Sequence, residues 1–213
     1  MSLLLTISLL HFVAQLSPGP DVLLIAKSAA STTRANALKV IAGISIGIVL
    51  WVILTLAGFT VLVAQFPWIQ QVLMLVGGAF LAKMGWAMLK GGISAYQQRQ
   101  NGETEIHSVE TAAKSYFLLG LFTNLSNPKT LIYFSSVFSL ALTSSASEYL
   151  KLQLAILIPL QTFLTFAALM WLISQPKMKQ YYQRSGMYID MLSGILFLIF
   201  ALWLIYDAVT LLG

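Results

Sequence analysis

The sequence predicts an all-α membrane protein of six transmembrane helices, built as two inverted repeats of three helices each. Composition is the first reason: 58% of the 213 residues are hydrophobic and only 9% are charged, whereas a soluble domain carries about 25% charged residues. The second reason is that the chain divides into six apolar blocks, each near the ~20 residues that cross a bilayer. The third is a pair of proline-containing motifs that interrupt the first and fourth blocks.

Short polar links separate the blocks, and one link is longer than the rest. The predicted spans cover about residues 3–30, 37–64, 69–89, 114–143, 149–174 and 187–212. Residues 91–113 are polar and carry charges of both signs, so they are expected to form a loop. Residues 175–185 are expected to form a basic link. The chain is therefore predicted to be one transmembrane domain, 1–213, with a first repeat at about 1–90 and a second at about 114–213.

The first span contains the segment Ser17-Pro18-Gly19-Pro20-Asp21. Each proline lacks an amide hydrogen and its ring clashes with the carbonyl group one turn earlier, so a helix cannot continue through both. The helix is expected to stop and restart here, with Asp21 in the first turn of its second part. Irregular backbone in a membrane is tolerated only where protein or a watery cavity surrounds it. The break is therefore predicted to line a site.

The second half of the chain repeats features of the first half. Residues 125–129 (Leu-Ser-Asn-Pro-Lys) align with residues 16–20 (Leu-Ser-Pro-Gly-Pro) at an offset of 109. The third and sixth spans share four residue types at an offset of 117, where Gly77, Phe80, Leu81 and Trp86 match Gly194, Phe197, Leu198 and Trp203. Because each repeat holds an odd number of spans, the second enters the membrane upside down. Inverted repeats with paired broken helices are typical of secondary transporters, whose site lies between the breaks.

Basic residues are concentrated on one side of this six-span topology, which the positive-inside rule assigns to the cytoplasm. Ten of the twelve fall there: Lys27, Arg34, Lys39, Lys83, Lys90, Arg99, Lys114, Lys177, Lys179 and Arg184. Only Lys151 falls on the opposite side, and Lys129 lies within the fourth span. Both termini are therefore predicted to face the outside of the cell.

Three motifs make the chain resemble the LysE/RhtB family of amino-acid exporters. They are Pro-Gly-Pro-Asp at 18–21, the pair Gly43 and Gly47 in the second span, and Thr-Asn-Leu-Ser-Asn-Pro-Lys at 123–129. The Asn-Pro-Lys break followed by Ile-Tyr-Phe at 132–134 resembles the homoserine/threonine efflux branch most closely. The resemblance covers the whole chain and implies proton-driven export of small neutral amino acids (threonine, homoserine or serine) across a bacterial plasma membrane. The glycine pair by itself predicts close helix packing.

Asp21 and Lys129 are the ionisable residues expected at the two breaks. A charged side chain at the bilayer centre costs about 2.5–3.5 kcal/mol on insertion scales. Asp21 is interpreted as a proton-linked carboxylate or a partner for a substrate ammonium group, and its structural alternative is a cap of the following helix. Lys129 either binds a substrate carboxylate or forms a static ion pair with Asp21.

The remaining candidates for the substrate and coupling path form the breaks or are neutral polar residues near them. The complete set is Gln15, Pro18, Gly19, Pro20, Asp21, Asn124, Asn127, Pro128, Lys129 and Gln161. Gln15 and Asn124 precede the two breaks, where they either bind a zwitterion or join helices. Gln161 lies in the middle of the fifth span. His11, in the first span, is either a proton relay or, as favoured here, a packing residue.

Composition excludes several other classes of protein. Without cysteine, the chain cannot form disulfides, thiolate metal sites or thiol redox centres. The main alternative is a divalent-metal exporter on a related inverted-repeat fold, whose path would need clustered His, Asp or Glu. No nucleophile or metal cluster indicates an enzyme, no cofactor is expected, and a scattered net charge of +5 offers no nucleic-acid surface. The expected partners are an amino acid, protons and the lipid bilayer, with monomer and homo-oligomer both left open.

Overall fold

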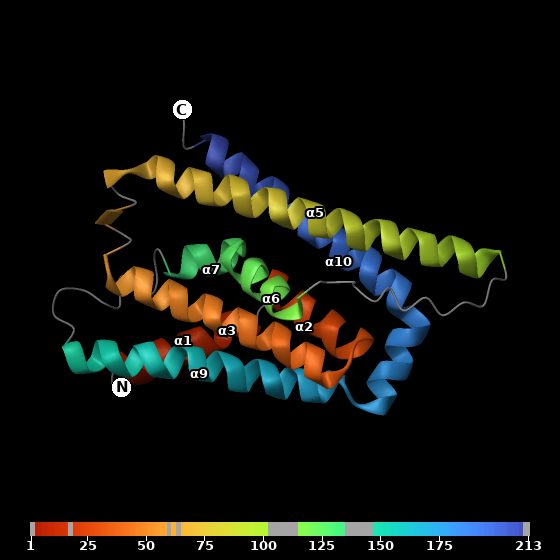
Figure 1. The fold of residues 1–213 in the computed structure, drawn as a ribbon, viewed down its shortest axis with the longest axis horizontal. Helices are drawn as coiled ribbons and strands as arrows, with labels where there is room; N and C mark the ends of the chain where they lie inside the picture. Colours follow the sequence, from red (N-terminus) through yellow and green to blue (C-terminus); the bar gives the residue numbers. More distant parts are fainter. Residues whose placement is uncertain are drawn as a thin grey trace.

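The computed structural model is a bundle of helices that run roughly along one direction (Figure 1). It describes residues 3–16, 19–58, 61–62, 65–101, 115–134 and 147–210. The helices are α1 (Leu3–Leu16), α2 (Pro20–Ser31), α3 (Arg34–Leu56), α5 (Pro67–Gln100), α6 (Tyr116–Leu125), α7 (Pro128–Ile132), α9 (Glu148–Ile173) and α10 (Pro176–Thr210). These ranges contain no strand, which confirms the predicted all-α class.

Several of these helices are suited to cross a membrane. Four are long and apolar enough: α3, α9, and the segments Trp68–Gln100 of α5 and Ser185–Thr210 of α10. Helices α1 and α2 together form a fifth candidate, bent by 60°. Residues 135–146, which would complete the predicted fourth span after α6 and α7, lie outside the described residues. The protein is a helical, multi-pass membrane protein, with four or five candidate spans in the part described.

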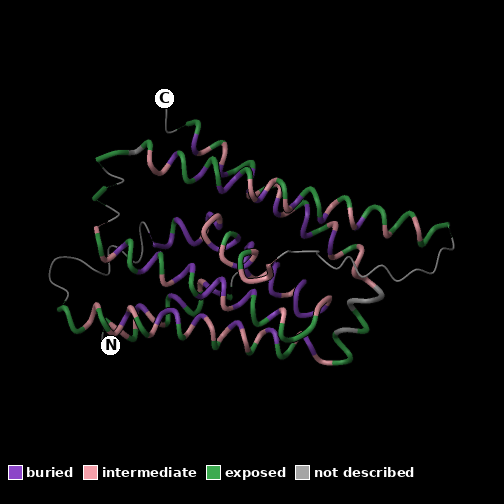
Figure 2. The backbone as a smooth tube through the Cα atoms, viewed as in Figure 1, coloured by how far each residue is buried: buried purple, intermediate pink, exposed green. Residues whose placement is uncertain are grey.

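The burial pattern is that of a protein surrounded by lipid. Buried residues lie on the helix faces that point into the bundle, and exposed residues follow the outer faces (Figure 2). Many of the exposed side chains are large and apolar, such as Val76 at 66% and Leu202 at 67% exposure. In water, apolar surface costs about 25 cal/mol per Å². In a bilayer the same surface meets lipid tails that are as apolar as leucine.

Helix α5 extends beyond the predicted third span. It continues to Gln100, so the prediction that residues 91–113 form a loop is wrong for 91–100. Residues 102–114 lie outside the described residues. The extension contains Gln and Arg residues, which are good helix formers. Because hydropathy separates only lipid-facing from water-facing residues, it cannot recognise a helix that continues into water.

Two other helix ends also differ from their predicted positions. Helix α10 begins at Pro176, so residues 175–185 are largely helical, and the prediction of a link there is wrong. Helix α3 ends at Leu56, short of the predicted boundary near residue 64. Gly58 follows with φ of 87°, a left-handed conformation that commonly ends helices and favours glycine.

The first proline motif coincides with helix ends. Helix α1 ends at Leu16 and α2 begins at Pro20, while Ser17 and Pro18 lie outside the described residues. Pro20 occupies the start of α2, where a missing amide hydrogen breaks no helical bond. Gly19 stands at the capping position in extended backbone.

The second proline motif also separates two helices. Helix α6 ends at Leu125 and the five-residue α7 begins at Pro128. Asn127 caps α7, because its Oδ1 accepts a 3.0 Å hydrogen bond from the backbone N–H of Lys129. Each motif thus places a proline at the start of a helix and a charged residue immediately after it.

The larger helix interfaces join one half of the chain to the other. Helix α5 packs along α10, α3 packs against α6 and α9, and α1 and α2 pack against α9. A Cβ atom at Gly43 would collide with the carbonyl oxygen of Phe117, and one at Gly47 would collide with Oδ1 of Asn124. Gly120 of α6 approaches the α3 backbone equally closely. The close packing predicted for the glycine pair is therefore confirmed.

We expect Gly43→Ala to lower the free energy of unfolding by about 1–3 kcal/mol, because the added methyl group must displace the α6 backbone. Thermal unfolding in detergent micelles would measure the change. Ile46→Ala, on the exposed side of the same helix, is the matched control and should have a smaller effect. A Gly43→Ala protein as stable as the wild type would contradict the close approach of α3 and α6.

Candidate functional site

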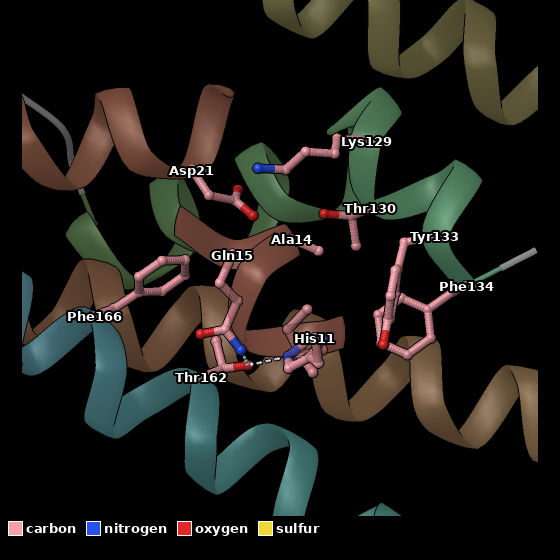
Figure 3. Close-up of a pocket in the computed structure, with 11 residues that line it drawn as sticks. His11, Ala14, Gln15, Asp21, Lys129, Thr130, Tyr133, Phe134, Thr162 and Phe166 are labelled. Carbon is pink, nitrogen blue, oxygen red and sulfur yellow. Dashed lines mark hydrogen bonds between the residues drawn. The ribbon is translucent and has the colours of Figure 1, made fainter. Parts of the chain in front are cut away.

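A small cavity lies where α1, α2, α3, α7 and α9 come together (Figure 3). Its volume is about 30 Å³, enough for one or two water molecules. It is lined by His11, Ala14, Gln15, Asp21, Ile48, Lys129, Thr130, Tyr133, Phe134, Thr162 and Phe166. The structure thus brings Gln15, Asp21 and Lys129, three of the residues predicted from sequence, to one place.

Asp21 is held from across the bundle by α6. It is the second residue of α2 and is 5% exposed. Its Oδ2 accepts a 2.8 Å hydrogen bond from Nδ2 of Asn124, which is fully buried. Gly19, and not Asp21, occupies the capping position of α2, and no side chain caps that helix. The carboxylate therefore joins two helices and does not serve as the cap of its own.

Lys129 extends from α7 to the first break. Its Nζ lies close to Gly19, where a Cβ atom would be 3.2 Å away, so a side chain at that position would crowd the ammonium group. Lys129 points toward Asp21 (Figure 3), and the two interact electrostatically. Asn127 and Thr130 also face the Asp21 carboxylate. The two breaks thus supply a cation and an anion to one cavity.

A hydrogen-bonded group from α1 and α9 forms the opposite wall. The hydroxyl of Thr162 donates its only proton to the carbonyl of Ile158 at 2.9 Å. It therefore accepts hydrogen bonds from Nε2 of Gln15 at 3.1 Å and from Nε2 of His11 at 2.9 Å. Because Nε2 of His11 must then carry a proton, its Nδ1 is an acceptor in the neutral ring. Among the described residues, this buried Nδ1 has no hydrogen-bond partner.

Aromatic rings complete the lining on the side of α7. The ring centroids of Tyr133 and Phe134 lie 5.3 Å and 6.4 Å from that of His11. Phe134 also stacks on Trp51 at 6.3 Å. Buried rings arranged in this way give the cavity an apolar wall beside its charged one.

The other residues of the breaks surround the cavity without lining it. Pro20 begins α2 next to Asp21. The side chains of Asn124 and Asn127 interact with the Asp21 carboxylate. Pro128 lines a second cavity on another side of α7. Pro18 lies outside the described residues.

Gln161 lies away from the cavity. Its Nε2 donates to the carbonyl of Ser8 and its Oε1 accepts from the hydroxyl of Ser8, both at 2.9 Å. The next residue, Thr162, points into the cavity instead, because neighbouring residues on a helix differ by about 100° in direction. Sequence reasoning missed Thr162, Thr130, Tyr133, Phe134 and Phe166 as lining residues. The signals available were the Ile-Tyr-Phe motif after the second break and the polar pair within α9.

A second buried pair of opposite charges lies outside this cavity, between α2 and α10. Nζ of Lys27 is 3.0 Å from Oδ1 of Asp190, and the two side chains are 6% and 10% exposed. From the sequence, Lys27 is predicted only to lie among the basic residues of the cytoplasmic side. Nearby, the hydroxyl of Ser174 donates to the carbonyl of Ala29 at 3.3 Å, which links α9 to α2.

The groups in the first cavity suit a zwitterion better than a metal ion. A carboxylate, an ammonium group, amides and a hydroxyl can together bind both charged ends of an amino acid. Metal sites need several converging His, Asp or Glu ligands. The described part of the chain holds no group of three or more such residues placed to bind one ion.

Comparison with known proteins finds relatives that match nearly the whole chain. A sequence model of LysE type translocators matches residues 12–208. The chain is 35% identical over 206 residues to the threonine efflux protein of Salmonella typhimurium, covering 96% of this chain and 98% of that protein. It is 34% identical over 206 residues to the threonine efflux protein of Escherichia coli, with the same coverage. It is 33% identical over 207 residues to an uncharacterized membrane protein of Haemophilus influenzae, covering 97% and 98%.

No solved structure matches the chain. The match to the translocator family spans nearly the whole sequence, and it includes both breaks and all the residues that line the cavity except His11. The chain therefore belongs to the LysE family of translocators, which are transporters and not enzymes.

Proposed function

We propose that this protein exports small neutral amino acids, threonine first among them, from the bacterial cytoplasm in exchange for protons. The observation that carries the proposal is the meeting of Asp21 and Lys129 in one cavity, each from a different break. Asp21 is suited to a substrate ammonium group and Lys129 to a substrate carboxylate. The threonine efflux proteins among its relatives support threonine as the first substrate to test.

The cavity must open for this activity. A volume of about 30 Å³ holds one or two water molecules, so an amino acid can enter only after α1, α7 or α9 moves. The proposed cycle therefore alternates between this closed form and forms that are open to one side of the membrane.

The proposal includes two inverted repeats, in which α1–α2 and α6–α7 are corresponding broken spans. Exchanging the two halves turns the contact of α3 with α6 into the contact of α9 with α1, and both occur. The contacts α5–α10 and α3–α9 are unchanged by the exchange. Repeats related by a twofold axis require such pairs, so the packing supports this arrangement.

A panel of labelled substrates tests the function directly. Cells that produce the chain would be loaded with labelled threonine, homoserine, serine or lysine, or with cadmium ions, and efflux would be followed against cells without it. We expect faster efflux of threonine and at least one other small neutral amino acid, with no effect on lysine. Efflux of cadmium without any amino acid would overturn the proposal in favour of a metal exporter.

Reporter fusions test the proposed orientation in the inner membrane. Ten of the twelve basic residues fall on one predicted side, so fusions after Gln97 and Lys179 should read as cytoplasmic. Fusions after Gln65 and at the C-terminus should read as external. A cytoplasmic C-terminus would contradict the six-span arrangement with inverted repeats.

A further inference from the structure

A second and larger cavity lies beside α7. Its volume is about 290 Å³, near the lower end of small-molecule sites and well above the 30 Å³ of the first cavity. Its walls come from the first turns of α5, from α7 and from the last turns of α10. These ends of α5 and α10 lie together at one end of the bundle (Figure 1).

Helix α7 separates the two cavities. Lys129 and Thr130 line the first cavity, whereas Pro128, Leu131 and Ile132 line the second. Residues three and four apart share one face of a helix, so opposite faces of this short helix bound the two spaces. A wall of only five residues therefore stands between the charged cavity and the larger one.

The polar groups of the second cavity suit an organic ammonium ion. Asp207 lines it, and the Asp207 carboxylate makes no hydrogen bond or ion pair with the part of the chain that the structure describes. Trp203 lies one turn earlier on α10 and lines the same cavity. A carboxylate beside an indole ring attracts an ammonium group through its charge and through the ring face. Gln70, across the cavity on α5, carries an amide that can donate to a ligand carboxylate.

A divalent cation fits this cavity poorly. Calcium takes six to eight oxygen ligands and magnesium six, usually with more than one carboxylate. Asp207 stands alone here, and no cluster of three His, Asp or Glu occurs among the described residues. The single carboxylate matches a ligand with one positive charge.

We propose that this second cavity binds the exported amino acid after it passes α7, with the Asp207 carboxylate receiving its ammonium group. The inference rests on the proposed function, because the predicted topology places the start of α5 and the end of α10 on the outer side of the membrane. It adds a second binding site to the path and assigns a role to a charged residue outside the two breaks.

The absence of cysteine from the chain allows a selective test. Thr210→Cys and Ile132→Cys each place one thiol in the cavity wall, and each full-length variant would be reconstituted in lipid vesicles. Modification rates would be measured with a cationic and an anionic membrane-impermeant thiol reagent, with and without threonine. The same rates would be measured in each cysteine variant that also carries Asp207→Asn. Glu148→Gln, which removes an exposed carboxylate at the same end of the bundle, is the matched control.

We expect the cationic reagent to react at least about fivefold faster than the anionic one, because the Asp207 charge lies in the same cavity. Threonine should slow the reaction at least about threefold. Asp207→Asn should remove both effects, while Glu148→Gln should preserve them. The inference is overturned if threonine gives no protection at either position, or if Asp207→Asn leaves the protection intact. The same holds if only a lipid-soluble reagent reaches the thiols, since lipid would then fill the cavity.

A separate measurement keeps this inference distinct from the proposed function. Efflux of labelled threonine by the unaltered protein in the same vesicles tests export alone. If the protein exports threonine but threonine does not protect the cavity thiols, the second site is rejected and the proposed export function stands. Absence of threonine efflux would reject the exporter, and the second site with it, because its ligand is the exported amino acid.

Discussion

Asp21→Asn should abolish threonine accumulation driven by a pH gradient while leaving threonine exchange across the membrane within about tenfold of wild type, or about 1.4 kcal/mol. Asparagine keeps the size of the side chain, and its carbonyl oxygen can still accept the hydrogen bond from Asn124. What the substitution removes is the proton that a carboxyl group can bind and release. The substitution should therefore abolish coupling to protons while largely preserving substrate binding.

Both activities would be measured in vesicles, with and without an imposed pH gradient. Glu148→Gln removes a carboxylate that is 89% exposed and paired with Lys151, and it should leave both activities unchanged. If Asp21→Asn still concentrates threonine when the gradient is applied, another group carries the proton. His11 would then be the next residue to test, because its ring lines the same cavity and its Nδ1 is an acceptor.

Lys27→Met should cause the largest loss of stability, about 3–5 kcal/mol, because it leaves the charge of Asp190 buried without its partner. Asp190→Leu should cost a similar amount for the same reason. Replacing both residues, Lys27→Met with Asp190→Leu, should recover most of the loss, since two apolar side chains need no charge pairing. Unfolding by denaturant in detergent micelles would give the free energies.

The exposed pair Lys151 and Glu148 provides the control. Their charged atoms are even closer, at 2.7 Å, but Glu148 is 89% exposed, so Lys151→Met should cost less than about 1 kcal/mol. Equal effects of Lys27→Met and Lys151→Met would show that the pair between α2 and α10 is open to water and contributes little.

The sequence predicted the parts of the fold that depend on local chemistry. Prolines fix where a helix can start, so the starts of α2 and α7 at Pro20 and Pro128 follow directly from the chain. The C-terminal end of α5 and the start of α10 could not be predicted in the same way. Their polar turns are helical, and hydropathy distinguishes lipid from water but does not distinguish a helix in water from a loop.

The candidate site was predictable only in part, for a related reason. Asp21 and Lys129 are conspicuous because a charge is rare at bilayer depth. Thr162 and Phe166 look like ordinary residues of an apolar span, and only the packing of α9 against α1 and α2 brings them to the cavity. The pairing of Lys27 with Asp190 could not be predicted, because the two residues lie more than 160 positions apart in the chain.

The packing of each half against the other has a consequence for how the protein is made. Helix α5 leaves the ribosome long before α10, the helix along which it packs most extensively. At about 5–20 residues per second, the ~110 residues between their ends take roughly 5–20 seconds to synthesise. During that time α5 is in the bilayer without its main partner. The small-residue surface around Gly85 and Gly92, which packs against α10 in the folded protein, is not yet covered. The nascent chain therefore acquires its native packing only when its last helix has been inserted.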